Sequence, residues 1–313
     1  MLSFNLLEDS FEKFLDNYSM KFNPFQDKIA HDDIFIGKDN KALIRIFRAI
    51  RNNQSSISLL IGPTGSGKSE NADYVVRNLP EEYVFWYNQM MKHTHRQLAI
   101  SIIKDIDPNF AGKLNSREEV LRAFNMLLEA LPLQNKKLLC IFDQGEHFSK
   151  DALEFIVNST NPRAGGTRPF SAIILAVPRF ETRLKRWMKY YDTTLKRILV
   201  KEYIKPFTPE EGYEYIARAL AASMGIEFED IVRKNDLTPF EISAVELLVE
   251  LSQGHPSTLT DLCYLSLEAA SETSSEQRVN SDIVEEVWEK YNNKELHSKA
   301  VEWYREKGFY KDD

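Results

Sequence analysis

Apolar residues in the first two thirds of the chain form two kinds of pattern. Short runs that are apolar on both faces predict buried strands at 57–61, 83–87, 138–142 and 172–177. Apolar residues at helical spacing predict helices at 39–53, 68–78, 94–106 and 116–130. Strands that alternate with helices and are apolar on both faces are typical of a parallel α/β sheet.

The strand pattern ends near Pro206, and helical patterns follow at 209–223, 239–253, 256–272 and 280–291. Thr208 before Pro209, Thr238 before Pro239, and Asn280 or Ser281 are suitable helix starts. We therefore expect four regions: an N-terminal helical and extended segment (1–30), an α/β nucleotide-binding domain (31–205), a small all-α domain (206–291) and a charged tail (292–313) that contains Trp303 and Tyr304. A final helix is one interpretation of this tail.

Composition narrows the class of protein. The 313 residues carry a net charge of −7, with 43% hydrophobic and 28% charged residues, as in ordinary globular proteins. The two cysteines, Cys140 and Cys263, lie in apolar stretches, which excludes a disulfide framework and favours a reducing compartment. The sequence predicts no export signal and no transmembrane helix, so we expect a cytoplasmic protein without a membrane partner.

The strand at 57–61 leads into the phosphate-binding pattern GxxxxGK[ST]. It consists of Gly62, Pro63, Thr64, Gly65, Ser66, Gly67, Lys68 and Ser69. Glycines allow backbone N–H groups to surround phosphates, and the following helix offers its N-terminus to the same anion. Lys68 is expected to reach the β- and γ-phosphates, and the Ser69 hydroxyl to bind Mg²⁺. The sequence thus predicts a P-loop for ATP, or another purine nucleoside triphosphate, with Mg²⁺.

Asp143 ends the apolar strand at 138–142 and is the expected second magnesium ligand, directly or through water. Gln144 follows it, where many ATPases of this architecture place glutamate to polarise the attacking water. Glutamine orients water but is a poor proton acceptor. Four interpretations stay open: a naturally slow hydrolase, a carboxylate supplied instead by Glu146, an engineered Glu→Gln replacement that traps ATP, or a neutral residue that starts the next turn.

With these motifs the chain resembles AAA+ ATPases, in particular the origin-recognition (Cdc-type initiator) branch and its ExeA- and TnsC/TniB-like relatives. The resemblance covers roughly residues 22–291. It rests on the P-loop, on Tyr87-Asn88 at a strand end, and on a Walker B segment beginning at Asp143. It rests also on a lid-opening segment at 205–211 and a turn at 253–259. Phe35 and Ile36 match the box that lies near adenine in the family. The resemblance implies a P-loop AAA+ sheet with flanking helices, followed by a helical lid, and it favours ATP.

Two departures and one arginine bear on catalysis. The sensor-2 arginine of the family falls at Ser257, and the strand at 172–177 ends without the usual polar residue. Together with Gln144 they suggest weak or partner-dependent hydrolysis. The resemblance implies a ring or filament in which an arginine finger completes the neighbour's site. Arg197 matches that position best, and Arg179 and Arg183 are alternatives.

Segment 179–205 carries nine basic and three acidic residues, with Trp187, Tyr190 and Tyr191 interleaved. It is either a DNA contact or a solvated face that touches other subunits. His93 and His95 lie two residues apart, do not share a helix face, and are not expected to bind metal. We therefore expect a nucleotide-dependent oligomeric switch that associates with DNA or a DNA-processing machine in replication, transposition or defence, and we also expect a protein partner. The alternative is an ATPase module of a protein-only assembly; a metabolic P-loop kinase is disfavoured by the helical domain.

Overall fold

The computed structural model describes residues 2–26, 41–52, 57–89, 94–161, 169–188 and 197–310. The chain forms two compact units, each treated on its own below. The sheet unit comprises 39–62 and 68–204, and the helical unit comprises 1–38, 63–67 and 205–313. The tip of the P-loop, Pro63–Gly67, thus belongs to the helical unit.

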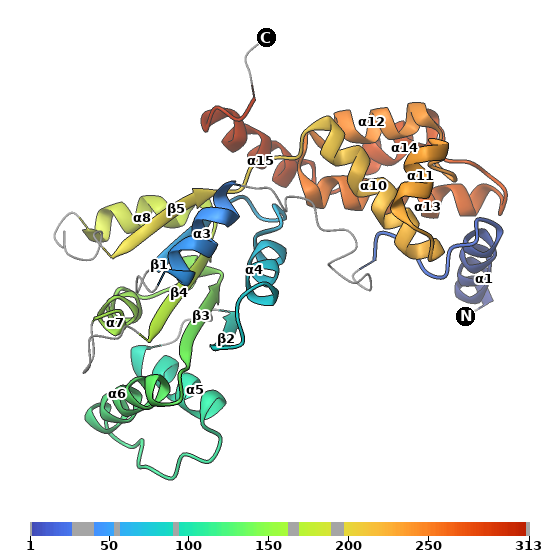
Figure 1. The fold of residues 1–313 in the computed structure, drawn as a ribbon. Coiled ribbons are helices and arrows are strands. Elements are labelled where there is room, and N and C mark those ends of the chain that lie inside the picture. The colour runs from blue at the N-terminus through green and yellow to red at the C-terminus, as the bar shows by residue number, and fades with distance from the viewer. Residues whose placement is uncertain are drawn as a thin grey trace. The chain divides into compact units, whose positions relative to one another are not determined.

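The sheet unit is built on five strands, all paired in parallel (Figure 1). They are β1 (Ile57–Ile61), β2 (Tyr83–Gln89), β3 (Lys137–Asp143), β4 (Phe170–Ala176) and β5 (Ile198–Tyr203). Their order across the sheet is β2-β3-β4-β1-β5. Every residue of β1 and β4 is buried, as expected for strands covered on both faces. The predicted parallel α/β fold is confirmed.

Helices cover both faces of this sheet. They are α3 (Lys41–Arg51), α4 (Lys68–Arg77), α5 (His95–Ile106), α6 (Arg117–Leu133), α7 (Lys150–Ser159) and α8 (Pro178–Met188). The connection from β1 to β2 crosses the sheet in the opposite sense from the connections β2–β3 and β3–β4. Right-handed crossovers therefore place α4 on the opposite face from α5 and α7. Accordingly α3 packs with α4, and α5 packs with α6 and α7. The direction in which successive strands are added to the sheet changes at β1. Ligands of such sheets bind beyond the carboxyl ends of the strands at this point, so we expect the ligand site there.

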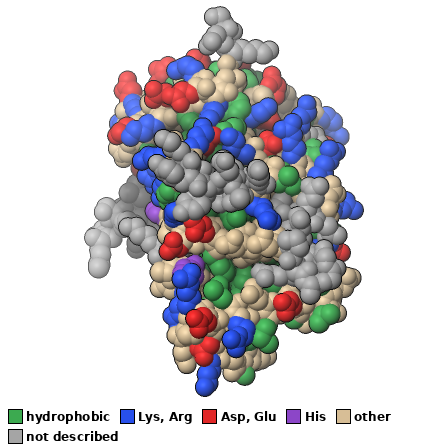
Figure 2. Space-filling view, turned by 90° about the vertical axis from the view of Figure 1, so that its left-hand side faces the viewer, with side chains coloured by type: hydrophobic (Ala, Val, Ile, Leu, Met, Phe, Trp, Pro, Cys, Tyr) green, Lys and Arg blue, Asp and Glu red, His purple; other side chains and the backbone are tan. Residues whose placement is uncertain are grey.

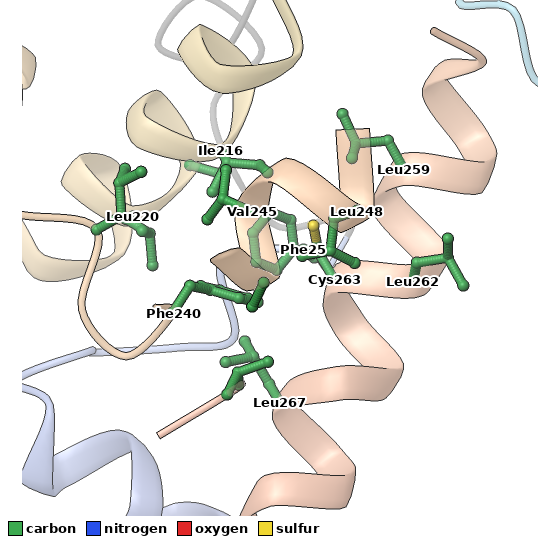
Figure 3. Close-up of a cluster of buried hydrophobic side chains, with 14 of the residues drawn as sticks. Phe25, Ile216, Leu220, Phe240, Val245, Leu248, Leu259, Leu262, Cys263 and Leu267 are labelled. Carbon is green, nitrogen blue, oxygen red and sulfur yellow. The ribbon is translucent and has the colours of Figure 1, made fainter. Parts of the chain in front are cut away.

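The helical unit contains seven helices in the described chain, and the first six contribute side chains to one apolar core. The seven are α1 (Leu2–Asn17), α10 (Pro209–Met224), α11 (Phe228–Lys234), α12 (Ile242–Ser252), α13 (Pro256–Thr273), α14 (Ser281–Lys290) and α15 (Lys294–Glu306). In Figure 3, Phe25 from the N-terminal segment lies among side chains of α10, α12 and α13. Its ring meets Phe240 edge-on at 5.9 Å. The N-terminal segment is therefore part of this core.

Several elements were not predicted from the sequence. Strand β5 alternates between exposed and half-buried residues and carries Lys201 and Glu202, so it lacks the apolar run of the other strands. Helices α7, α8 and α11 were also missed. The charged tail, by contrast, forms the final helix that was one interpretation of it: α15 buries Trp303 and Tyr304. Among the described residues no helix combines the length and apolarity needed to cross a bilayer.

Candidate nucleotide-binding site

The P-loop connects the end of β1 at Ile61 to the start of α4 at Lys68. Gly65 and Gly67 have φ angles of +77° and +78°, a region that side chains with a Cβ rarely adopt. The Ser66 N–H donates to the Pro63 carbonyl at 3.3 Å and closes a turn between them. The Ser66 side chain is buried, and its hydroxyl has no hydrogen-bond partner among the described residues. The loop thus has the backbone of a phosphate cradle, with one buried hydroxyl still to be satisfied.

Lys68 stands at the first turn of α4, and its ammonium group donates to the Gly62 carbonyl at 3.0 Å. Burial lowers the pKa of Lys68, while the nearby carboxylates of Asp143, Glu146 and Glu70 act in the opposite direction. A partly desolvated cation is stabilised by a bound anion, whereas the nearby carboxylates already supply part of that compensation. The lysine is therefore suited to bind phosphate, as predicted.

Asp143 lies at the carboxyl end of β3 and is only 7% exposed. Its Oδ2 atom accepts hydrogen bonds from the Ser69 hydroxyl and from the Tyr87 hydroxyl, both at 2.8 Å. Its Oδ1 atom accepts from the N–H of Gln144 at 2.7 Å. Ser69 and Asp143, the two predicted magnesium ligands, are therefore in direct contact, and their oxygens are the hard donors that Mg²⁺ prefers.

Tyr87 was predicted only as part of a strand-end motif, and its contact with Asp143 was not expected. It reaches Asp143 because β2 pairs directly with β3, with Tyr87 opposite Ile141. Burial raises the pKa of Tyr87, and the hydrogen bond to Asp143 raises it further. The hydroxyl is therefore a proton donor at neutral pH. The neighbouring Asn88 has a buried Oδ1 atom with no partner among the described residues.

Gln144 and Glu146 lie on the turn that follows Asp143, and their environments differ. Gln144 adopts a left-handed conformation (φ 56°, ψ 46°) with an exposed side chain. For a residue other than glycine such a conformation is strained. Glu146 accepts a hydrogen bond from the Val177 N–H at 3.3 Å, just beyond β4. The turn thus places Gln144 in solvent and holds the Glu146 carboxylate at the end of β4.

The three arginine candidates have distinct surroundings within the sheet unit. Arg197, just before β5, donates to Asn161 Oδ1 at 2.7 Å. Arg183 donates to the Phe148 carbonyl at 3.1 Å and lies over the Trp187 ring at 4.6 Å. Burial lowers the pKa of Arg183. Arg179 is exposed. Arg183 and Arg197 are therefore both engaged by their own subunit, and the identity of a finger stays a prediction.

Acidic neighbours partly neutralise the basic segment 179–205. Glu181 lies 2.9 Å from Lys201 and 3.4 Å from Lys185. On the face shown in Figure 2, Lys and Arg side chains are interspersed with Asp and Glu. Residues 189–196, which include Tyr190 and Tyr191, lie outside the described residues, as do Phe35, Ile36 and His93. No cluster of three or more His, Cys, Asp or Glu side chains suited to a metal occurs in the described parts of the chain.

Comparisons with known proteins agree with this geometry. Residues 51–184 match the family described as AAA domain. The ORC2 protein of Aeropyrum pernix, solved as ADPNP–ADP complexes, is 15% identical with a TM-score of 0.59, over 84% of this chain and 70% of that one. Cdc6p of Pyrobaculum aerophilum is 13% identical with a TM-score of 0.60, over 82% and 67%.

A third structure, the ORC1 protein of Aeropyrum pernix in complex with DNA, is 17% identical with a TM-score of 0.55, over 82% of this chain and 66% of that one. A search of curated proteins found no match. The site therefore has the geometry of a P-loop, and the fold is that of the matched AAA domain and of these solved structures. The chain carries an AAA domain at 51–184 and shares its fold with these ORC and Cdc6 proteins.

The contact between Tyr87 and Asp143 can be tested by a double-mutant cycle. We expect Tyr87→Phe to lower the free energy of unfolding by about 1–3 kcal/mol, because it removes a hydrogen bond to a buried charge. In the Asp143→Asn background the same change should cost roughly 1 kcal/mol less. Urea unfolding of the four proteins measures both values. Equal costs in the two backgrounds would show that the two side chains are not coupled.

Proposed function

We propose that this protein is an ATP-binding AAA+ ATPase that acts as a nucleotide-dependent oligomeric switch on DNA or on a DNA-processing machine. The observation that carries the nucleotide part is the 2.8 Å contact between Ser69 Oγ and Asp143 Oδ2 at the end of the P-loop. It joins the two oxygens that P-loop ATPases use for Mg²⁺. The ORC2 relative, solved as ADPNP–ADP complexes, has the same fold.

Each part of the proposed site has a role that follows from its chemistry. Backbone N–H groups of 62–67 and the start of α4 bind phosphate oxygens. Lys68 neutralises charge on the terminal phosphates, and Ser69 and Asp143 supply oxygens for Mg²⁺, which would offset phosphate charge when bound. Gln144 orients water but cannot accept its proton well, so we propose slow or partner-dependent hydrolysis.

One relative and the basic residues of α8 support the proposed contact with DNA. The ORC1 relative was solved in complex with DNA and has the same fold. On α8, Arg179, Lys185 and Arg186 are exposed, and basic side chains on one short helix can contact phosphates. Arg197 is proposed as the finger that completes a neighbour's site, with Arg179 and Arg183 as the alternatives. A protein-only assembly remains the competing function, and it predicts no dependence on DNA.

The catalytic position is tested by turnover. We expect Gln144→Glu to raise ATP turnover by about 100-fold, because general-base catalysis typically contributes at least that much. Turnover and oligomer size are measured with and without duplex DNA, by phosphate release and light scattering. Gln144→Ala is the matched control and should give no gain.

Two outcomes would change the proposal. If Gln144→Glu is no faster but Glu146→Gln abolishes the basal rate, the carboxylate is supplied by Glu146. If no variant hydrolyses ATP and DNA changes neither rate nor assembly, the DNA switch is wrong and an ATP-held scaffold is the better description.

The DNA contact is tested by removing charge from α8. We expect Lys185→Ser with Arg186→Ser to weaken duplex binding about ten-fold or more, and to reduce the slope of log affinity against log salt by about two. Lys290→Ser with Lys299→Ser is the control, because these lysines are 74% and 65% exposed and the charge change is the same. Equal losses in both pairs would mean that only net charge matters and that α8 is not the contact.

A further inference from the structure

A chain of hydrogen bonds joins the tip of the P-loop to the last helix of the helical unit. His255 Nε2 lies 2.9 Å from the Thr64 carbonyl oxygen, and His255 Nδ1 lies 2.9 Å from Thr258 Oγ1. Thr258 Oγ1 lies 3.1 Å from Nδ1 of His297, which belongs to α15. His255, Thr258 and His297 are 4%, 1% and 5% exposed. All these residues belong to the same compact unit as Pro63–Gly67.

The chemistry of the partners fixes the direction of the bond to Thr64, and the directions of the other two bonds follow for a neutral His255 ring. A carbonyl oxygen only accepts, so His255 must carry a proton on Nε2 and donate it to Thr64. In the neutral ring Nδ1 is then an acceptor, so the Thr258 hydroxyl donates to it. The Thr258 oxygen in turn accepts from His297 Nδ1. Burial lowers the pKa of His297, which favours its neutral ring, and in that ring the tautomer that carries the proton on Nδ1 makes this donation.

A second bond holds the next P-loop carbonyl. The Ser257 N–H, in the first turn of α13, donates to the Gly65 carbonyl at 3.1 Å. The first N–H groups of a helix have no partner within the helix, so they are available for such a bond. The approach is close: a Cβ placed on Gly65 would lie 2.5 Å from Ser257 Cβ. Two successive carbonyls of the loop are thus held by residues 255 and 257.

Holding a carbonyl also orients the neighbouring N–H. A peptide unit is planar and trans, so its C=O and N–H point in opposite directions. With the Thr64 oxygen directed at His255, the Gly65 N–H points the opposite way, away from His255. Phosphate binding by a P-loop depends on backbone N–H groups fixed in this way before the ligand arrives.

We infer that His255 is a positioning residue for the P-loop, which orients the Thr64–Gly65 peptide for phosphate and is itself held by Thr258 and by His297 of α15. The inference rests on the proposed nucleotide binding at this loop. His255 acts through the backbone and not by touching the nucleotide. In the resemblance described above, the adjacent position 257 is where an arginine was expected; here the turn binds the loop instead.

Two substitutions of similar polarity separate this role from simple packing. In His255→Gln the amide nitrogen is the same number of bonds from the backbone as His Nε2, so it can donate to the Thr64 carbonyl. In His255→Asn the amide reaches only the position of Nδ1, so it can serve Thr258 but not Thr64. The probes are amide hydrogen exchange of 64–67 without nucleotide, and the dissociation constant for a fluorescent ATP analogue with Mg²⁺. Thermal unfolding without nucleotide verifies that both full-length variants fold.

We expect His255→Asn to bind the ATP analogue about five- to ten-fold more weakly than the unaltered protein, the effect of one hydrogen bond. Its loop amides should exchange faster. His255→Gln should stay within about three-fold in affinity and retain slow exchange. Thr258→Val, which removes the hydroxyl that orients the ring, should give an intermediate loss.

Hydrogen exchange and nucleotide affinity distinguish a failure of the positioning role from a failure of the proposed function. If His255→Asn matches the unaltered protein in exchange and affinity, or if Gln and Asn are equally impaired, the positioning role is overturned. If the unaltered protein does not bind the analogue, the proposed function fails. The exchange difference between His255→Gln and His255→Asn then still decides whether His255 holds the loop, and its absence overturns the inference.

Discussion

A carboxylate buried at the end of β3 constrains the construction of the whole nucleotide end of the sheet. Asp143 is 7% exposed, and a charge in that position must be matched by hydrogen-bond donors. The donors come from three places: Ser69 on α4, Tyr87 on β2 and the N–H of Gln144. Each donor requires a feature of the fold, namely the short P-loop, the pairing of β2 with β3, and the left-handed turn at Gln144. The strain at Gln144 is thus linked to satisfying the carboxylate beside it.

The P-loop, like the surroundings of Asp143, stabilises negative charge with hydrogen-bond donors. A triphosphate carries several negative charges, and in the proposed function the chain binds it with backbone dipoles and one lysine instead of a dense basic surface. This agrees with a net charge of −7 for the whole chain. Because the P-loop would bind phosphate through backbone N–H groups, binding depends on the orientation of each peptide unit in the loop. Contacts such as those of His255 and Ser257 with the loop carbonyls therefore matter as much as the motif itself.

The sequence predicted the motif and the buried strands because both depend on local patterns. The apolar runs of β1, β3 and β4, and the spacing of Gly62 to Ser69, need no knowledge of tertiary structure. Strand β5 could not be predicted in this way, since an edge strand with Lys201 and Glu202 lacks a continuous apolar run. The role of Tyr87 required the strand order, and that of His255 required the packing of α13 on the loop. Neither pairing leaves a signal in the spacing of residues along the chain.

The central claim is that Ser69, Asp143 and the P-loop form one site for Mg²⁺ and ATP. Titration calorimetry tests it most directly, with ATP added to the unaltered protein in Mg²⁺ or in EDTA, and to Lys68→Ala in Mg²⁺. The account predicts one ATP per chain, with affinity that falls in EDTA and is lost in Lys68→Ala. Binding that is absent from the unaltered protein, or that is unchanged in Lys68→Ala, would contradict it.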